Sequence, residues 1–456
     1  MAVRIICESA ELAVECLQSA QAIGVDAEPE MAADWPAAIA DALAAGPAAV
    51  ALVEPPTLEQ LVELGVVARG AKRRAAIAIL GHGATAERLR HVALDLGITA
   101  VSEVAPLVSV LALSAAGGED AWTASLRALS KPERARLQPI VAPGTRAGGQ
   151  LLRAEGGLIA WTRDGAGPGR VVGSARDLAE AIAALRDTDR DTPQIESIVE
   201  DVDQRAVIDV LFGPRRSLSD PASKAALLPY GIPVPVEELC ASASRAAAEA
   251  SRIGFPVRIS LTSPDLRVWD HPDLAVDMVD NAARVRDTFR QLMGVARNRL
   301  QQMAPNDARA VDRLLGVMVT ATSEAAALLG VRAWSLPRGR VAMEVGFADP
   351  HGAAAGDRTL AVLPAPQSAI DRALRRLQGS DLLFGGTAAQ RRARLDAVGD
   401  VLLRSSAFVN DRRAEVESVE LRPLALLLDG SAEVREACVT VSDAFERSLI
   451  APPAAS

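Results

Sequence analysis

Short apolar runs of β type alternate with amphipathic helical segments through the first hundred residues. We expect strands at Val3–Ile6, Ala48–Val53, Ala75–Leu80 and Ile98–Val101, separated by Ala- and Leu-rich segments of helical period. Strands that alternate with helices in this way form a parallel sheet covered by helices on both faces. The rhythm therefore predicts a small α/β unit over residues 1–115.

Composition narrows the classes of partner. The 456 residues carry a net charge of −9, and aromatic residues make up only 3% of the chain, so neither a basic surface nor base-stacking side chains point to nucleic acid. The longest apolar stretch, Val104–Ala116, is too short to span a bilayer. Four cysteines without CxxC spacing, and an N-terminus interrupted by Glu8, favour a cytoplasmic protein with reduced thiols.

The segment Gly81–Thr85 joins the third expected strand to the helix expected at Glu87–Leu96. In a parallel α/β sheet this edge faces ligands, and N–H groups at a helix start can hold an anion. His82 is therefore a candidate phosphate acceptor and catalytic residue. The alternative is a tight turn that carries a solvated histidine.

Residues 116–215 read as a small α/β connecting region. Leu151–Trp161 and Arg170–Val172 are expected to form a hairpin across the turn at Arg163–Gly169, which is rich in Gly, Asp and Pro. Helices are expected at Ala175–Leu185 and at about Val202–Leu211.

From Ser219 onwards the pattern becomes more specific. A helix is expected at Pro221–Leu228, a strand at Val234–Val236, then a helix capped by Ser242 or Ser244 and ended by Gly254. A further strand follows at Val257–Leu261.

Asp220–Asp265 resembles the opening of the ATP-grasp domain of the NDP-forming acyl-CoA synthetases, the acetate–CoA ligase family. The resemblance rests on the following pieces: Lys224, Tyr230-Gly231-Ile232-Pro233-Val234-Pro235, Gly254-Phe255-Pro256-Val257 and Ser263-Pro264-Asp265. Later, Gly316–Val319 resembles the central strand of the family and Val419–Leu424 resembles its closing strand. We therefore expect an ATP-grasp-like α/β domain over residues 216–450. By topology, the N-terminal unit resembles the family's flavodoxin-like domain, in which a phosphate-carrying histidine follows a strand as His82 does.

The resemblance implies ligation of an organic acid to coenzyme A through acyl-phosphate and phosphohistidine steps, driven by ATP and magnesium. It assigns Lys224 and Glu324 to the nucleotide site and Glu420 to the metal. This chain departs from the family at several of the working positions. Ser260 stands where the family places a phosphate-binding lysine, and Arg422 stands where it has a metal-binding asparagine. The glycine-rich segment expected after the central strand is replaced by Arg338–Pro350.

Two arginines lie beside the lost positions. Arg258 and Arg267 either replace the missing phosphate-binding cations, since guanidinium groups bind phosphate well, or are ordinary solvated arginines. Trp269 and Trp334 either stack on an adenine or belong to the core. An acidic cluster follows at residues 265–280. It is read either as a metal site or as a polar loop and the exposed face of the next helix: Asp265, Asp270, His271, Asp273, Asp277 and Asp280.

Three hypotheses follow. The first is a catalytically degenerate ATP-grasp pseudoenzyme that is kept for binding, regulation or assembly. Its partner is a complete acyl-CoA synthetase or another protein subunit, and an oligomer is expected.

The second is an active acid–CoA ligase with a rewired ATP site that uses Arg258, Arg267, Glu420 and His82. The third is a sensor of CoA esters or nucleotides without turnover. Under the first, we expect Arg422 to pair with Glu420 or Glu417, because strand alternation places Arg422 and Glu420 on one face.

Overall fold

The computed structural model divides the chain into two compact units that meet in sequence near residue 194, and each is described by itself. Among the residues that it describes, no helix is both long enough and apolar enough to cross a membrane. The structure describes residues 3–23, 27–32, 34–45, 48–71, 75–81, 83–115, 137–140, 151–154, 160–161, 170–171, 181, 184, 199, 202–212, 217–307, 309–348, 356–383 and 385–445.

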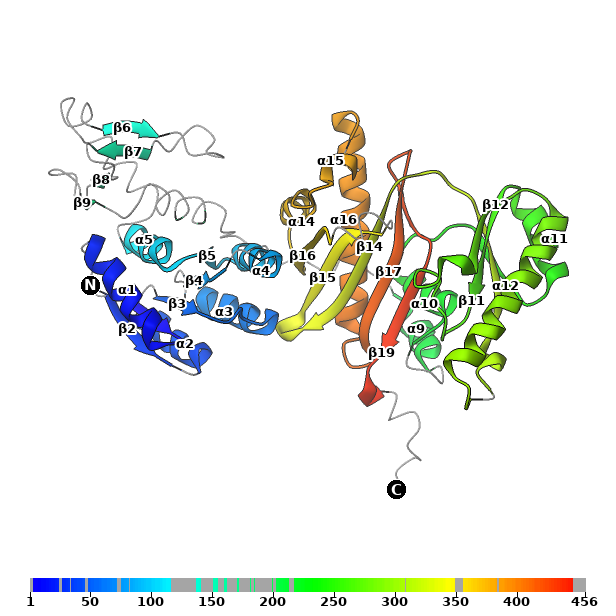
Figure 1. Ribbon diagram of the computed structural model, residues 1–456, viewed down its shortest axis with the longest axis horizontal. Helices are drawn as coiled ribbons and strands as arrows, with labels where there is room; N and C mark the ends of the chain where they lie inside the picture. Colours follow the sequence, from blue (N-terminus) through cyan, green and yellow to red (C-terminus); the bar gives the residue numbers. More distant parts are fainter. Residues whose placement is uncertain are drawn as a thin grey trace, which may run out of the picture. The chain divides into compact units, whose positions relative to one another are not determined.

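A five-stranded parallel sheet forms the centre of the first unit (Figure 1). Its strand order is β2-β1-β3-β4-β5, the flavodoxin-like order, so the predicted fold class is confirmed. The strands are β1 (Val3–Cys7), β2 (Ala27–Met31), β3 (Ala48–Leu52), β4 (Ala75–Ile79) and β5 (Thr99–Val101). The helices between and after them are α1 (Ala10–Ile23), α2 (Trp35–Ala45), α3 (Leu58–Gly70), α4 (Ala84–Asp95) and α5 (Val104–Ala115).

The burial of each strand explains whether it can be predicted from the sequence. Every residue of β3 and of β4 is buried, so both strands read as continuous apolar runs. β2 is an edge strand with the sequence AEPEM, and none of its residues is fully buried. Its charged residues and Pro29 hide it from a pattern search, and the sequence analysis missed it.

The hairpins of the connecting region differ in part from the prediction. β8 (Ala160–Trp161) pairs with β9 (Arg170–Val171) as expected, but β7 (Leu151–Ala154) pairs with β6 (Leu137–Ile140) instead. The helix predicted at Ala175–Leu185 lies largely outside the described residues. Separate domain boundaries at residues 115 and 215 remain a proposal.

The second unit contains two antiparallel sheets. The first has four strands in the order β10-β13-β11-β12, so that β13, the expected central strand, lies inside the sheet. Two helices, α11 (Ala243–Ile253) and α12 (Ala282–Met303), pack on one face of this sheet. The strands are β10 (Glu237–Cys240), β11 (Val257–Thr262), β12 (Ala275–Val279) and β13 (Gly316–Ala321).

One predicted strand of this sheet is misplaced. The sequence pattern puts it at Val234–Val236, but β10 begins at Glu237. Pro233 and Pro235 lack the N–H groups that a paired strand donates, so regular pairing starts only after them. The neighbouring helix follows the prediction, because Ser242 caps α11 and Gly254, with a positive φ, ends it.

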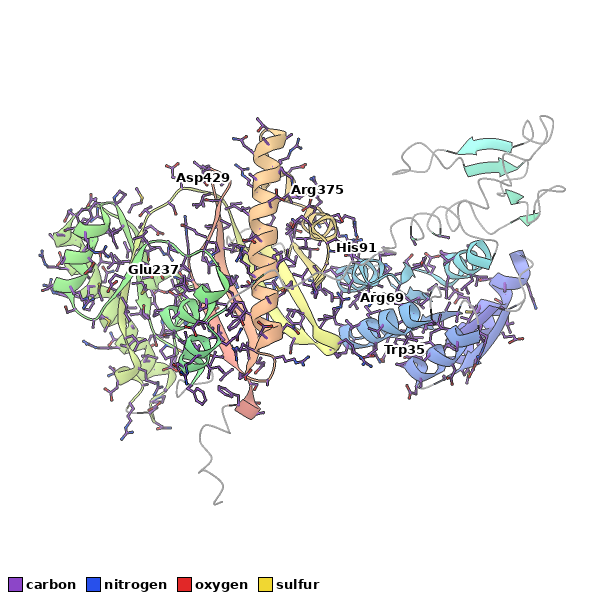
Figure 2. The ribbon with its side chains drawn as sticks, turned by 180° about the vertical axis from the view of Figure 1, so that it is seen from behind. Trp35, Arg69, His91, Glu237, Arg375 and Asp429 are labelled. Atoms are coloured by element: carbon purple, nitrogen blue, oxygen red, sulfur yellow. The ribbon has the colours of Figure 1, made fainter. Side chains whose placement is uncertain are left out.

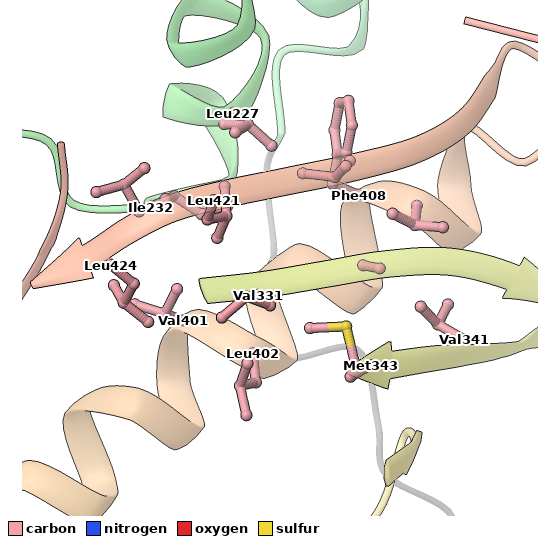
Figure 3. Packing of buried hydrophobic residues seen from close by; sticks show 14 of the residues in the cluster. Leu227, Ile232, Val331, Val341, Met343, Val401, Leu402, Phe408, Leu421 and Leu424 are labelled. Carbon is pink, nitrogen blue, oxygen red and sulfur yellow. The ribbon is translucent and has the colours of Figure 1, made fainter. Parts of the chain in front are cut away.

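The second sheet has six strands, in the order β16-β15-β14-β17-β18 with β19 paired to β17. One face is covered by α14 (Gln367–Arg375) and α16 (Ala388–Asp411), whose apolar side chains meet those of β14, β15 and β17 in one core cluster. Figure 3 shows the part of this cluster between α16 and the strands. The strands are β14 (Ala325–Leu336), β15 (Arg340–Phe347), β16 (Arg358–Leu363), β17 (Val416–Leu427), β18 (Ala432–Val434) and β19 (Ala437–Val441). The remaining helices are α9 (Gln204–Leu211), α10 (Asp220–Leu227) and α15 (Ser380–Leu383).

Alternation along these strands leaves the opposite face of the six-stranded sheet free of that core. Val331, Met343 and Leu421 point into the helix-covered core, so their neighbours in sequence point the other way. The candidate site residues of β14, β15 and β17 therefore lie together on this second face, which we call the open face.

Candidate functional site

Ser260 lies on the face of β11 that points away from α11 and α12, since Val257 and Ile259 pack in the core beneath those helices. The side chain is buried, and the cavity beside it measures only about 20 Å³. That volume holds about one water molecule. The walls of the cavity include Asp220, Arg267, Trp269, Glu436 and Cys438. The position that the resemblance aligns with a phosphate-binding lysine is therefore closed by this chain's own side chains.

Arg258, two residues earlier on the same face, is bound by carboxylates on both sides. Its guanidinium donates to Asp277 at 2.9 Å and to Glu436 at 2.8 Å. Burial raises the pKa of the Glu436 carboxyl to about 7, even though the attraction of Arg258 acts to lower it. Arg258 is thus neither a solvated arginine nor a free phosphate-binding cation.

Lys224, on α10, is surrounded by hydrogen-bond acceptors. Its ammonium group donates to Asp220 at 3.0 Å, to Glu237 (labelled in Figure 2) at 2.8 Å, and to the backbone carbonyl of Arg435 at 2.6 Å. Burial lowers the pKa of Lys224, but the attraction of Asp220 and Glu237 outweighs burial and raises it overall. An ammonium group has three donors, and all three are used here. Lys224 joins α10, β10 and the segment before β19.

Arg267 lies over the ring of Trp269, with the guanidinium carbon 5.6 Å from the ring centroid. One of its nitrogens is 3.6 Å from Glu420, and another donates to the Ser217 hydroxyl at 3.3 Å. Glu420 is also 3.9 Å from Arg332, so the candidate metal ligand is held between two arginines.

A cavity of about 180 Å³ opens on the open face of the six-stranded sheet, and we call it the open-face cavity. It carries three arginines and two glutamates. Its walls are formed by Gly330, Val331, Arg332, Glu344, Gly346, Phe347, Arg358, Glu420 and Arg422.

The predicted pair between Arg422 and Glu420 is wrong. Glu420 pairs with Arg267 and Arg332 instead, and the structure records no ion pair between Arg422 and either Glu420 or Glu417, both of which lie within the described residues. An irregularity in the pairing of β14 with β17 falls next to Arg422, where the register shifts between Leu329 and Val331. Alternation correctly placed Arg422 on the face of Glu420, but arginines on β14 and after β11 reach the carboxylate.

The acidic cluster of the sequence does not assemble into a metal site. Asp265 binds Arg313, Asp273 binds Arg299, and Asp277 binds Arg258. Among the described residues, no three His, Cys, Asp or Glu side chains are grouped closely enough to hold a metal ion. Glu420, flanked by arginines, does not fit magnesium either, because guanidinium groups repel a cation and cannot ligate it.

The remaining candidates are dispersed. Trp269 and Trp334 are half-buried, and each is covered by an arginine, so neither is a fully buried core residue. Glu324 is exposed in the turn before β14. His82 lies outside the described residues. Just before it in the chain, the backbone carbonyls of Ile79 and Gly81 accept hydrogen bonds from the guanidinium of Arg90 on α4.

Sequence reasoning missed Glu436, which closes the cluster around Arg258. The two residues are 178 positions apart, and no local motif links them. It also missed the cavity residues Glu344 and Arg358 as a pair, which faces Arg422 from β15 and β16. In the register of β15 with β16, Arg358 lies opposite Gly346, two residues from Glu344, and no sequence motif gives that register.

Comparison with known proteins places this site in a family. Residues 209–441, just over half of the chain, match the family model described as an ATP-grasp domain. The beta subunit of ADP-forming acetate–CoA ligase II of Pyrococcus furiosus is 22% identical over 230 residues, which cover 50% of this chain and 93% of that protein.

Two solved structures are similar over about half of the chain. PH1788 from Pyrococcus horikoshii is 20% identical, with a TM-score of 0.44, over 52% of this chain and 97% of that one. The apo form of the dinucleotide-forming acetyl-coenzyme A synthetase 1 of Candidatus Korarchaeum cryptofilum is 18% identical, with a TM-score of 0.40, over 52% and 99%. Through residues 209–441, this chain belongs to the ATP-grasp family.

Proposed function

We propose that this protein is a catalytically degenerate relative of the NDP-forming acyl-CoA synthetases, in which the ATP-grasp domain serves binding, regulation or assembly. Its partner in this proposal is a complete acyl-CoA synthetase or another protein subunit. The relative from Pyrococcus furiosus is itself named as a subunit, which supports an assembly role.

The observation that carries the proposal is the closure of the site around Ser260. The cavity there has room for about one water, and Arg258, Arg267 and Lys224 already contact carboxylates. A triphosphate would have to displace those carboxylates and open the cluster. Phosphoryl transfer depends almost entirely on free cations and a metal around the phosphates, so their engagement removes the activity while the fold persists.

The same observation weighs against a rewired ligase. That hypothesis needs Arg258 and Arg267 to hold phosphates and Glu420 to hold magnesium. Arg258 is bound at 2.8 and 2.9 Å by two acids, and Glu420 is already shared by two arginines. A sensor of CoA esters without turnover needs none of these groups and stays compatible with the proposal.

Calorimetric titration with ATP and magnesium tests the proposal. Each charge-assisted contact with phosphate contributes roughly 1.5–3 kcal/mol, so losing one cation and the metal weakens binding by about two to four orders of magnitude. We expect no heat of binding up to about 1 mM ATP. A parallel titration with coenzyme A and acyl-CoA esters separates a sensor from an assembly module. A micromolar dissociation constant for ATP that requires magnesium would restore the ligase hypothesis.

A further inference from the structure

The open-face cavity remains open in the same domain in which the site around Ser260 is closed. The open-face cavity measures about 180 Å³ and the cavity beside Ser260 about 20 Å³. The open-face cavity is lined by β14, β15, β16 and β17, and none of these strands lines the cavity beside Ser260. Pockets for drug-sized ligands measure about 300–1,000 Å³, so the cavity suits a small molecule.

The charges of the cavity do not cancel. Arg358 pairs with Glu344, and Glu420 is shared between Arg332 and Arg267. Within the part of the chain that the structure describes, the Arg422 guanidinium has no ion pair or hydrogen bond. The cavity therefore carries one positive charge that no acid of the described chain offsets.

Gly330 positions the stem of Arg422. A Cβ atom added to Gly330 would lie 3.7 Å from both Cγ and Cδ of Arg422, which is ordinary van der Waals contact, so the stem crosses β14 directly over this glycine. The side chain is half-buried, and Phe347 supplies an apolar part of the same wall. A guanidinium that is partly removed from water gains more from an anion than an exposed one does.

We propose that the open-face cavity binds the oxyanion group of a small molecule, phosphate or carboxylate, directly on Arg422 and without a divalent cation. A planar guanidinium donates two parallel hydrogen bonds to either oxyanion, whereas Arg332 and Arg358 of the same lining are paired with Glu420 and Glu344. The inference rests on the proposed function in one respect, since an intact magnesium site would place a cation where the anion is expected.

The test is a calorimetric and thermal-shift titration of the full chain in EDTA, with inorganic phosphate in one arm and malonate in the other. We expect at least one of the two anions to bind and to raise the melting temperature. Arg422→Gln is expected to weaken that binding about tenfold to a hundredfold. Arg290→Gln is the matched control, because Arg290 is exposed on α12 and the charge change is the same.

Each outcome decides the matter. Binding of phosphate or of malonate that falls in Arg422→Gln but not in Arg290→Gln supports the inference and identifies the anion. Arg422→Lys, which keeps the charge and loses the fork, replaces Arg422→Gln if that variant does not fold, and is expected to weaken binding more modestly. No binding in EDTA, or equal binding by wild type and the Arg422 variant, overturns the inference and leaves the proposed function intact. Binding that appears only with magnesium overturns both.

Discussion

Glu436 carries a large pKa shift in the second unit. Burial raises its pKa from 4.5 to about 7, while Arg258 and Lys224 act to lower it and Asp220 raises it further. Because the folded-state pKa lies above the unfolded one, the folded protein binds the proton more tightly. The free energy of unfolding gained from this group is therefore fully present below pH 4.5 and is lost as the pH rises to about 7.

The variant Glu436→Gln removes that dependence. We expect the stability of wild type relative to the variant to fall by up to about 3 kcal/mol as the pH rises through this window. Urea denaturation of both proteins in steps from pH 4.5 to pH 8 measures the difference. Parallel stability curves would contradict the assignment.

Arg422→Asn introduces the residue that the sequence resemblance leads us to expect at this position. Since Arg422 has no ion pair among the described residues, we expect its replacement to change the free energy of unfolding by less than about 1 kcal/mol. Arg258→Asn is the matched substitution at a paired site, and it strands Glu436, with an expected loss of about 3–5 kcal/mol. Chemical denaturation at pH 8 compares the two variants, and an equal loss in both would show that Arg422 is a structural residue.

At the scale of elements, two glycines of the second unit have opposite roles. Gly316 begins β13 with a φ of +131°, and a Cβ there would lie 2.2 Å from the carbonyl oxygen of Cys240 on β10. Gly294 lies within α12, and a Cβ there would meet nothing within 4 Å. The first glycine is required by the close approach of two strands, and the second only lowers helix propensity.

Alanine substitutions separate these roles. Gly316→Ala is expected to destabilise the protein by roughly 2–5 kcal/mol, through backbone strain and the contact with β10. Gly294→Ala is expected to stabilise it by about 0.5–1 kcal/mol. Thermal unfolding of the two variants and of wild type measures whether each substitution lowers or raises the stability. A Gly316→Ala protein as stable as wild type would contradict the pairing of β10 with β13.

Elements also show where local pattern is sufficient. The buried strands β3 and β4 were predicted to within one residue, and the caps of α11 were read from Ser242 and Gly254. The edge strand β2 was missed and β10 was placed three residues early. Edge strands gain little from apolar burial, so hydrogen-bonding partners decide their ends, and those partners are distant in sequence.

At the scale of the whole molecule, the two units have separate cores. One core cluster lies wholly within the second unit, between α16 and the six-stranded sheet, while the parallel sheet of the first unit is buried by its own helices. We expect residues 1–193 and 194–456 to unfold cooperatively when each is produced alone. Scanning calorimetry of the two fragments and of the full chain measures this. Loss of a cooperative transition in the 194–456 fragment would refute it.

The sequence by itself determined the α/β class of both units and the family of the second, because strand and helix periods and the Pro-, Gly- and Ser-rich turns are local signals. The resemblance also singled out Ser260 and Arg422 as departures from the family pattern, which stays a prediction. Only the tertiary structure decided what surrounds those positions. Arg258 meets Glu436 across 178 residues and Lys224 meets the carbonyl of Arg435 across 211, and Glu420 is shared by arginines from two other segments. The packing of the sheets determines which charged side chains meet, and the local periodicity of the sequence does not contain that information.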